Sequence, residues 1–209
     1  MSRFLLHFAP RTRAVGSLWL LEEAGAGYDL HELDITGGTQ KSPDFLALNP
    51  AGKLPVLEDR GPGGDWTGTV ICEAAAIVAY VADALPEAGL APAPGTRDRA
   101  AYQFWMTYGP GVAEPAMADL AWPRAKEAEP VAIGWPPFPA VQDRIEAALG
   151  GRDWLLGPRF SAADITVGGL LAFMNTFGML QPGPNIARYL AAIAARPARQ
   201  AALRKGGMA

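Results

Sequence analysis

The chain has 209 residues, of which 50% are hydrophobic and 19% are charged, and its formal net charge at pH 7 is −3. This length suits two domains with separate cores, and a slightly negative charge gives no general basic surface for nucleic acid. No apolar run approaches the roughly 20 residues of a membrane helix, and the first residues lack the apolar core and cleavage site of a signal peptide. We therefore expect a soluble, cytoplasmic protein with no nucleic-acid or membrane partner.

The residue types that bind metals are scarce. Cys72 is the single cysteine, which excludes an intramolecular disulfide and a cysteine-based zinc cluster and fits a reducing compartment. His7 and His31 are the only imidazoles, and no cluster has the spacing of metal ligands, so we expect no metal. We interpret Cys72 as a buried structural thiol and His7 as a core histidine with satisfied hydrogen bonds.

Strand and helix patterns alternate over the first part of the chain, separated by proline and glycine clusters. They predict a strand at 3–8, a helix at 12–23, a strand at 28–33, a polar loop at 34–41, a short helix at 42–48, strands at 54–58 and 69–72, and a helix at 73–83. The order β-α-β-α-β-β-α is that of a thioredoxin-like fold. The Cys-x-x-Cys pair of redox thioredoxins is missing, so any thiol must come from outside the chain.

A proline-rich segment at 86–96 predicts a linker, because no helix could cross it intact. Beyond it we predict helices at 97–108, with an interruption at 109–111 and a resumption near 114, and at 141–149, 165–177, 186–195 and 199–204, with an irregular stretch at 122–139. The expected organisation is therefore an α/β thioredoxin-like domain at 1–85, a linker at 86–96 and an all-α domain at 97–209.

The clearest local folding signal lies before the helix at 165–177. Ser161 followed by Asp164 has the spacing of a capping box, in which each side chain bonds the backbone N–H of the other residue. Phe160 and Ile165 would form the accompanying hydrophobic staple. Loss of such a cap costs roughly 0.5–2 kcal/mol, so its meaning is structural.

The stretch at 49–59 (NPAGKLPVLED) places a proline at the start of a predicted strand, after a turn that ends at Lys53. Pro55 has no N–H for a sheet ladder, and X-Pro is the bond where a cis peptide is cheap. A cis Leu54–Pro55 bond would turn the Leu54 backbone outward, so that it could pair with an extended ligand. The alternative is a trans proline in an ordinary loop, which base rates favour for this tripeptide alone.

Three segments, 17–25 (SLWLLEEAG), 49–59 and 70–77 (VICEAAAI), resemble in order and spacing the glutathione-binding domain of the glutathione transferases. Residues 10–14 (PRTRA) are similar to bacterial and fungal members, and the resemblance extends over nearly the whole chain. It implies a thioredoxin-like N-terminal domain plus an all-α C-terminal domain. It also implies a homodimer that binds glutathione on the first lobe and a small hydrophobic electrophile between the lobes.

The resemblance also implies which residues contact glutathione. Leu54, beside Pro55, would pair its backbone with the cysteinyl unit, Lys53 would meet the glycyl carboxylate, and Glu73 with Ala74 would receive the γ-glutamyl end. Backbone N–H groups at a helix start favour a carboxylate, which agrees with the last assignment. The family usually has Glu-Ser or Asp-Ser here, so Ala74 lacks a hydroxyl and weaker binding is expected. Considered alone, each residue has a structural interpretation. Lys53 is then a solvated lysine of the turn, and Glu73 is a carboxylate that stabilises the N-terminus of a helix.

The thiol-activating residue is the remaining assignment. Members of the superfamily use a Tyr or Ser hydroxyl near the end of the first strand, or carry Cys or Asn there. Thr12 is the candidate in this chain, because its hydroxyl could donate to a thiolate at the first helix. Alternatively Thr12 only caps that helix, and Arg11 or Arg13 lies nearest the sulfur.

The leading functional hypothesis is a glutathione transferase that activates the thiol for attack on a hydrophobic electrophile. The second hypothesis is glutathione-dependent reduction of disulfides or peroxides, which needs the same tripeptide site. The third is a binding protein that kept the fold and lost catalysis, which Ala74 and the missing Tyr, Ser or Cys favour.

Overall fold

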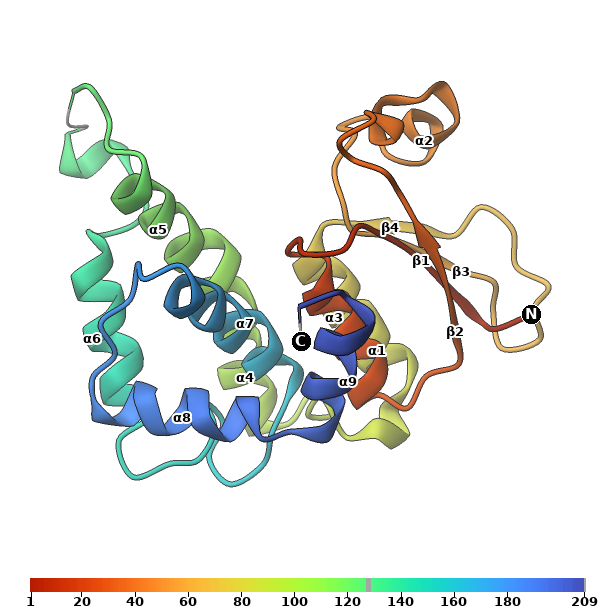
Figure 1. The fold of residues 1–209 in the computed structure, drawn as a ribbon. Coiled ribbons are helices and arrows are strands. Elements are labelled where there is room, and N and C mark those ends of the chain that lie inside the picture. The colour runs from red at the N-terminus through yellow and green to blue at the C-terminus, as the bar shows by residue number, and fades with distance from the viewer. Residues whose placement is uncertain (127–128, 209) are drawn as a thin grey trace. The chain divides into compact units, whose positions relative to one another are not determined.

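The computed structural model describes residues 1–126 and 129–208. The chain divides into two compact units, Met1–Leu90 with Ala195–Ala209, and Ala91–Ala194 (Figure 1). The division after Leu90 falls inside the expected linker. The segment Ala195–Ala209 belongs to the first unit, whereas the sequence had suggested that it ends the helical domain.

A four-stranded mixed sheet forms the centre of the first unit. Its strands are β1 (Phe4–Phe8), β2 (Tyr28–Glu32), β3 (Val56–Asp59) and β4 (Val70–Cys72), in the spatial order β2-β1-β3-β4. Strand β2 is parallel to β1, whereas β3 is antiparallel to both β1 and β4. The helical elements of this unit are α1 (Val15–Glu23), the 3₁₀ turn η1 (Thr39–Lys41), α2 (Pro43–Leu48), α3 (Ala74–Ala84), the 3₁₀ turn η2 (Pro86–Ala88) and α9 (Pro197–Lys205). The thioredoxin-like prediction is confirmed.

The starts of α1 and β3 lie further along the chain than predicted. Helix α1 begins at Val15 rather than at residue 12, because Arg11 has φ 57° and the chain turns before it becomes helical. Strand β3 begins at Val56, one residue after Pro55, which cannot donate to the ladder. Helix α2 begins as predicted, with the Ser42 hydroxyl accepting from the Phe45 N–H at 3.3 Å.

The core of the first unit follows the alternation of its strands. In β1 the side chains of Phe4, Leu6 and Phe8 are buried on one face of the sheet. Helices α1 and α3 pack together and contact β1 and β3, respectively. Phe45 of α2 packs with Leu33 and Val56 in a second cluster. Helices therefore cover both faces of the sheet, which explains why the neighbouring residues Val56 and Leu57 of β3 are both buried.

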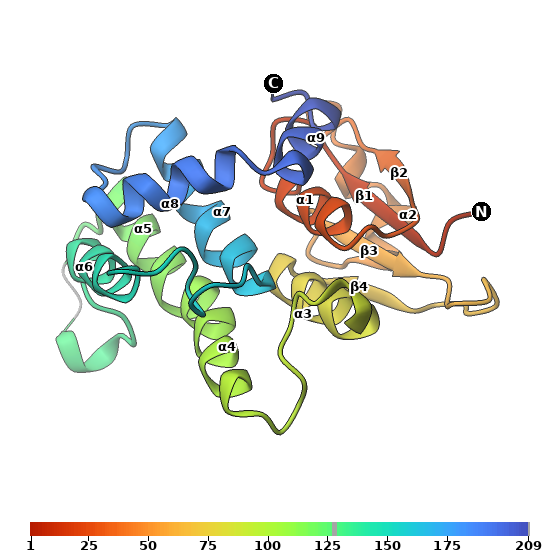
Figure 2. The same ribbon diagram turned by 90° about the horizontal axis from the view of Figure 1, so that it is seen from below.

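Helix α9 lies beside α1 (Figures 1 and 2). Arg196 forms a two-pronged ion pair with Glu23, at 2.5 and 2.7 Å, and Lys205 contacts Glu22 at 2.5 Å. Gly206 ends α9 so close to α1 that an added Cβ would lie 2.6 Å from a Val15 methyl group. These contacts place the C-terminal segment in the first unit.

The second unit is helical. It contains α4 (Arg97–Tyr108), the π turn η3 (Gly109–Ala113), α5 (Glu114–Ala121), the 3₁₀ turn η4 (Pro130–Ala132), α6 (Phe138–Ala148), α7 (Ala162–Thr176) and α8 (Pro184–Ala194). The all-α prediction is confirmed. Two residues of the predicted irregular stretch, 127 and 128, lie outside the described residues. Helix α6 starts three residues earlier than predicted, because a proline is tolerated in its first turn. None of the described helices combines the length and apolar character needed to cross a membrane.

Glycines allow close packing around α7, which contacts α4, η3 and α8. An added Cβ on Gly109 of η3 would lie 2.9 Å from the Thr166 methyl group. On Gly168 it would lie 2.4 Å from Ile193 and 2.8 Å from the Tyr189 hydroxyl. The predicted interruption of the first long helix is therefore the π turn where α4 meets α7.

Asp164 organises the start of α7. The predicted capping box with Ser161 is present, and the Asp164 carboxylate accepts from the Ser161 N–H at 2.8 Å. It also accepts from the Ser161 hydroxyl, the Leu155 N–H and the Tyr189 hydroxyl, each at 3.0 Å. Burial raises the pKa of Asp164, against the lowering effect of these donors. One carboxylate thus links the loop before α7, the cap and α8.

We expect Asp164→Ala to lower the free energy of unfolding by about 3 kcal/mol, because several buried donors lose their acceptor. Tyr189→Phe, which removes one donor and leaves the carboxylate, should cost about 1 kcal/mol. Denaturant unfolding followed by circular dichroism measures both. Equal losses for the two variants would show that only the hydrogen bond between Asp164 and Tyr189 contributes to stability.

Candidate functional site

The ends of three strands meet at one edge of the sheet. His7 near the end of β1 pairs with Val56 at the start of β3, and Val56 pairs with Cys72 at the end of β4. The residues that follow β1, precede β3 and follow β4 must therefore lie at this edge. They include all six residues singled out in the sequence, which are Thr12, Lys53, Leu54, Pro55, Glu73 and Ala74.

A short turn fixes the position of Lys53. The buried side chain of Asn49 donates to the Lys53 carbonyl at 2.9 Å and accepts from the Ala51 N–H at 3.1 Å. Gly52 has φ +59°, which favours glycine, and an added Cβ there would lie 2.5 Å from Lys41 Nζ. The Lys53 side chain is exposed beyond this turn.

The peptide bond between Leu54 and Pro55 is cis. The paired register of β3 begins at Val56, so Leu54 lies outside the ladder. Leu54 is half-buried, and its side chain packs against the cluster around Phe45. A segment with free backbone groups next to a paired strand can add an extended ligand to the sheet.

Glu73 and Ala74 stand where β4 becomes α3. Glu73 is the N-cap of α3 with φ 69° and ψ 121°, and both residues are exposed. The first N–H groups of a helix have no partner within the helix and attract anions. An exposed carboxylate and these N–H groups together suit a ligand end that carries both an ammonium and a carboxylate.

Two non-glycine residues of the described chain have positive φ, Arg11 at 57° and Glu73 at 69°. Both lie at the edge where the strand ends meet. A non-glycine residue with this conformation costs free energy and persists where the surrounding structure imposes it, often at functional sites. The strain thus marks the same edge that the strand register defines.

The loop after β1 holds Thr12 in a tight turn. The Thr12 hydroxyl donates to the Ala9 carbonyl at 2.7 Å and accepts from the Ala14 N–H at 3.3 Å. The Arg11 N–H donates to the Gly206 carbonyl at 2.9 Å, and the Arg11 side chain is exposed. The hydroxyl proton of Thr12 is therefore directed at backbone, while the neighbouring guanidinium faces solvent.

Lys41 is a residue that the sequence reasoning missed. It lies in η1, within a stretch interpreted as a polar loop, and its Nζ donates to the Ala51 carbonyl at 2.9 Å. It therefore adds a second cation beside the turn that presents Lys53. Only the folded chain reveals this, because ten residues of sequence separate Lys41 from Ala51.

Cys72 and His7 have structural surroundings. The half-buried Cys72 thiol contacts the Leu48 carbonyl at 3.7 Å, and burial, followed by the charge of Glu73, raises its pKa. The buried His7 ring has one nitrogen 2.6 Å from a Glu58 oxygen and the other 2.9 Å from a nitrogen of His31. Within residues 1–126 and 129–208, no three His, Cys, Asp or Glu side chains are placed to hold a metal ion.

A thioredoxin-like unit followed along the chain by a helical unit defines the class of this protein. Residues 1–83 match the family model for the glutathione S-transferase N-terminal domain, and residues 131–192 match that for the C-terminal domain. The chain is 31% identical over 196 residues to glutathione S-transferase 3 of Zea mays, covering 87% of this chain and 84% of that protein. The chain belongs to the glutathione S-transferase superfamily.

Other relatives and structures agree with this assignment. The chain is 28% identical over 164 residues to the disulfide-bond oxidoreductase YfcG of Escherichia coli K12, which covers 77% of this chain and 75% of YfcG. A glutathione transferase from Methylococcus capsulatus strain Bath superposes with a TM-score of 0.81 at 30% identity, covering 99% of this chain and 100% of that chain. The glutathione transferase URE2P8 of Phanerochaete chrysosporium, solved with oxidized glutathione, has a TM-score of 0.78 at 26% identity, with coverages of 99% and 96%.

We expect Glu73→Gly to raise the free energy of unfolding by about 1 kcal/mol, because glycine adopts positive φ without the Cβ penalty. The matched control is Ala74→Gly, one residue further along inside α3, which should lower it by about 0.5–1 kcal/mol. Denaturant unfolding curves of both variants give the comparison. A loss for Glu73→Gly as large as that of the control would contradict the assignment of strain to Glu73.

Proposed function

We propose that this protein is a glutathione transferase that binds glutathione at the sheet edge and activates its thiol for attack on a hydrophobic electrophile. The observation that carries the proposal is the convergence of Lys53, Leu54 and Glu73 at one edge of a thioredoxin-like sheet in a chain of this superfamily. Glutathione-bound relatives of the same fold support the ligand.

The chemistry of glutathione matches the groups at this edge. Its cysteinyl backbone pairs with the Leu54 backbone, as an added strand would. Its glycyl carboxylate meets Lys53 and Lys41, and its γ-glutamyl end meets the Glu73 carboxylate and the first N–H groups of α3. Each charged group of the tripeptide is thereby matched with a group of opposite charge or with backbone donors. The proposal involves no metal ion.

The reaction consists of deprotonation and displacement. The thiol proton leaves to solvent, the thiolate sulfur bonds to an electrophilic carbon, and a leaving group departs with the electron pair of its broken bond. A protein group that stabilises the thiolate raises the fraction of reactive sulfur at neutral pH. This group belongs to the loop after β1, which lies at the same edge as Leu54.

Thr12 is the residue expected from the sequence to stabilise the thiolate. Donation by this hydroxyl requires it to leave the Ala9 carbonyl, to which it donates at 2.7 Å. The exposed guanidinium of Arg11 needs no such exchange, and a nearby cation lowers a thiol pKa by its charge alone. We therefore propose Arg11 as the main stabilising group, with Thr12 positioning the loop.

The test is a glutathione titration that follows tryptophan fluorescence for binding and ultraviolet thiolate absorbance at several pH values. We expect bound glutathione to ionise well below its free pKa. Arg11→Gln should raise the bound thiol pKa by about 1. Thr12→Ala and the control Arg13→Gln should change it less.

A larger effect of Thr12→Ala than of Arg11→Gln would assign activation to the hydroxyl instead. Binding without any lowering of the thiol pKa would favour the non-catalytic binding protein. No binding at millimolar glutathione would overturn the ligand assignment, whereas the assignment of the fold would stand.

A hydroxyl at position 74 should strengthen glutathione binding. Ala74 is the first residue of α3 and exposed, so Ala74→Ser adds a donor beside the helix N–H groups without crowding. A hydrogen bond to a carboxylate is worth roughly 1.5–3 kcal/mol, so affinity should rise about tenfold or more. Ala76→Ser, at another exposed position of α3, is the control and should leave the affinity unchanged. Isothermal titration calorimetry measures both, and equal affinities would remove Ala74 from the site.

The second candidate function is glutathione-dependent disulfide reduction, which the similarity to the disulfide-bond oxidoreductase YfcG favours. It uses the same tripeptide site and no protein thiol. Turnover of a small mixed disulfide and of a chloronitroaromatic substrate, compared in one preparation, distinguishes reduction from transfer. Cys72→Ser should leave either activity unchanged, because the Cys72 thiol has a raised pKa. We also propose a cytoplasmic homodimer, as the family resemblance implies.

A further inference from the structure

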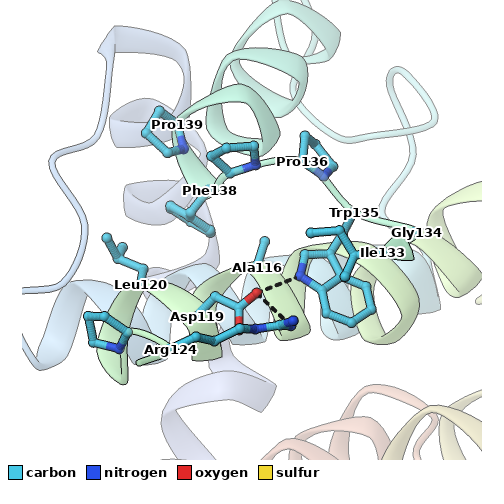
Figure 3. Close-up of a pocket in the computed structure, with 12 residues that line it drawn as sticks. Ala116, Asp119, Leu120, Arg124, Ile133, Gly134, Trp135, Pro136, Phe138 and Pro139 are labelled. Carbon is cyan, nitrogen blue, oxygen red and sulfur yellow. Dashed lines mark hydrogen bonds and ion pairs between the residues drawn. The ribbon is translucent and has the colours of Figure 1, made fainter. Parts of the chain in front are cut away.

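A cavity of about 860 Å³ lies within the helical unit, between the end of α5 and the start of α6. Figure 3 shows Asp119, Arg124 and Trp135 along one wall, and Phe138, Pro136 and Pro139 on the opposite wall. The volume falls in the range of about 300–1,000 Å³ typical of small-molecule sites. All residues that line the cavity belong to the helical unit.

A closed polar network forms one wall. Arg124 forms a two-pronged ion pair with Asp119, with N–O distances of 2.9 and 3.0 Å. The Trp135 indole N–H donates to the same carboxylate at 2.8 Å, and the Arg124 guanidinium lies 5.5 Å from the Trp135 ring centroid. The hydrogen bond from Arg124, followed by that from Trp135, lowers the pKa of Asp119, so the carboxylate is charged at neutral pH. The two opposite charges compensate each other while the indole ring is held in place.

The rest of the cavity is apolar. Leu120 and Ile133 line it together with the rings of Phe138 and a series of prolines at 136, 137 and 139. Leu120 is 47% exposed, which is high for a leucine side chain. Flat aromatic and proline surfaces favour a flat apolar ligand, which gains both by area burial and by ring stacking.

We propose that this cavity binds a neutral, planar aromatic molecule, stacked on Trp135 and enclosed by the apolar wall. Among the described residues that line the cavity, Asp119 and Arg124 carry the charges, and they are paired with each other. A ligand anion would have to compete with Asp119 for Arg124 or bury its charge without a partner, and both cost free energy. The paired charges therefore disfavour an anionic ligand, whereas a neutral ligand needs no charged partner.

Two fluorescent probes with the same aromatic frame test this selection. N-phenyl-1-naphthylamine is neutral, and 1-anilinonaphthalene-8-sulfonate adds one sulfonate. We expect the protein to bind the neutral probe at least tenfold more tightly. In Asp119→Asn the amide oxygen still accepts from Trp135, while Arg124 loses its counter-charge. The affinity for the anionic probe should therefore rise at least fivefold, and the affinity for the neutral probe should change less than twofold.

A second set of variants locates the binding. Trp135→Leu removes the stacking surface and should lower the affinity for the neutral probe at least tenfold. Trp122→Leu is the control, because Trp122 is 73% exposed and lies outside the lining residues drawn in Figure 3. Leu120→Glu adds a charge to the apolar wall at an exposed position that tolerates a charge. This variant should lower the affinity for the neutral probe by a similar factor. Circular dichroism and thermal melting of each variant check folding.

Equal affinities for the two probes that stay equal in Asp119→Asn would overturn the proposed selection. Unchanged binding of the neutral probe in both Trp135→Leu and Leu120→Glu would place that probe elsewhere on the protein and overturn the site. Absence of binding up to the solubility of the neutral probe would do the same. None of these titrations contains glutathione, so their failure leaves the proposed transferase function untouched.

Discussion

The antiparallel pairing of β3 with β1 on one side and with β4 on the other is the constraint on which the candidate site depends. It places the end of β1, the start of β3 and the end of β4 at one edge of the sheet. A slip of one residue would turn every side chain of β3 to the opposite face and separate Leu54 from Glu73. Val56 and Leu57 are buried on opposite faces of the sheet, so the strand that positions the candidate site is also part of the core.

The same edge concentrates conformations that the chain adopts only under constraint. Arg11 and Glu73 have positive φ, and the turn before Leu54 needs Gly52 and the Asn49 side chain. Positive φ at a non-glycine residue costs stability locally, and the surrounding structure has to impose it. In the helical unit, by contrast, Asp164 is a buried polar group whose hydrogen bonds all serve the fold.

Local motifs allowed much of the fold to be predicted from the sequence. Ser42 caps α2, Ser161 and Asp164 form the capping box of α7, and the glycines near 110 interrupt the first long helix. Each signal acts between residues a few positions apart, so no knowledge of the tertiary fold is needed. The start of α1 was misplaced because the φ of Arg11 depends on the surrounding fold, including the bond from its N–H to Gly206.

By itself, the sequence determined the order of strands and helices and the change from an α/β part to a helical part, because hydrophobic period, caps and turn residues are written in neighbouring positions. The six residues at the sheet edge were assigned through the resemblance to a family, and their roles stay a prediction. Only the tertiary structure decided that α9 belongs to the first unit and that Lys41 lies beside the turn of Lys53. It also decided that the Thr12 hydroxyl donates to the Ala9 carbonyl. It also brought Asp119, Arg124 and Trp135 to one wall of a cavity. Such contacts join positions separated in sequence or set the rotamer of one side chain, and both follow from packing, which the order of residues does not reveal.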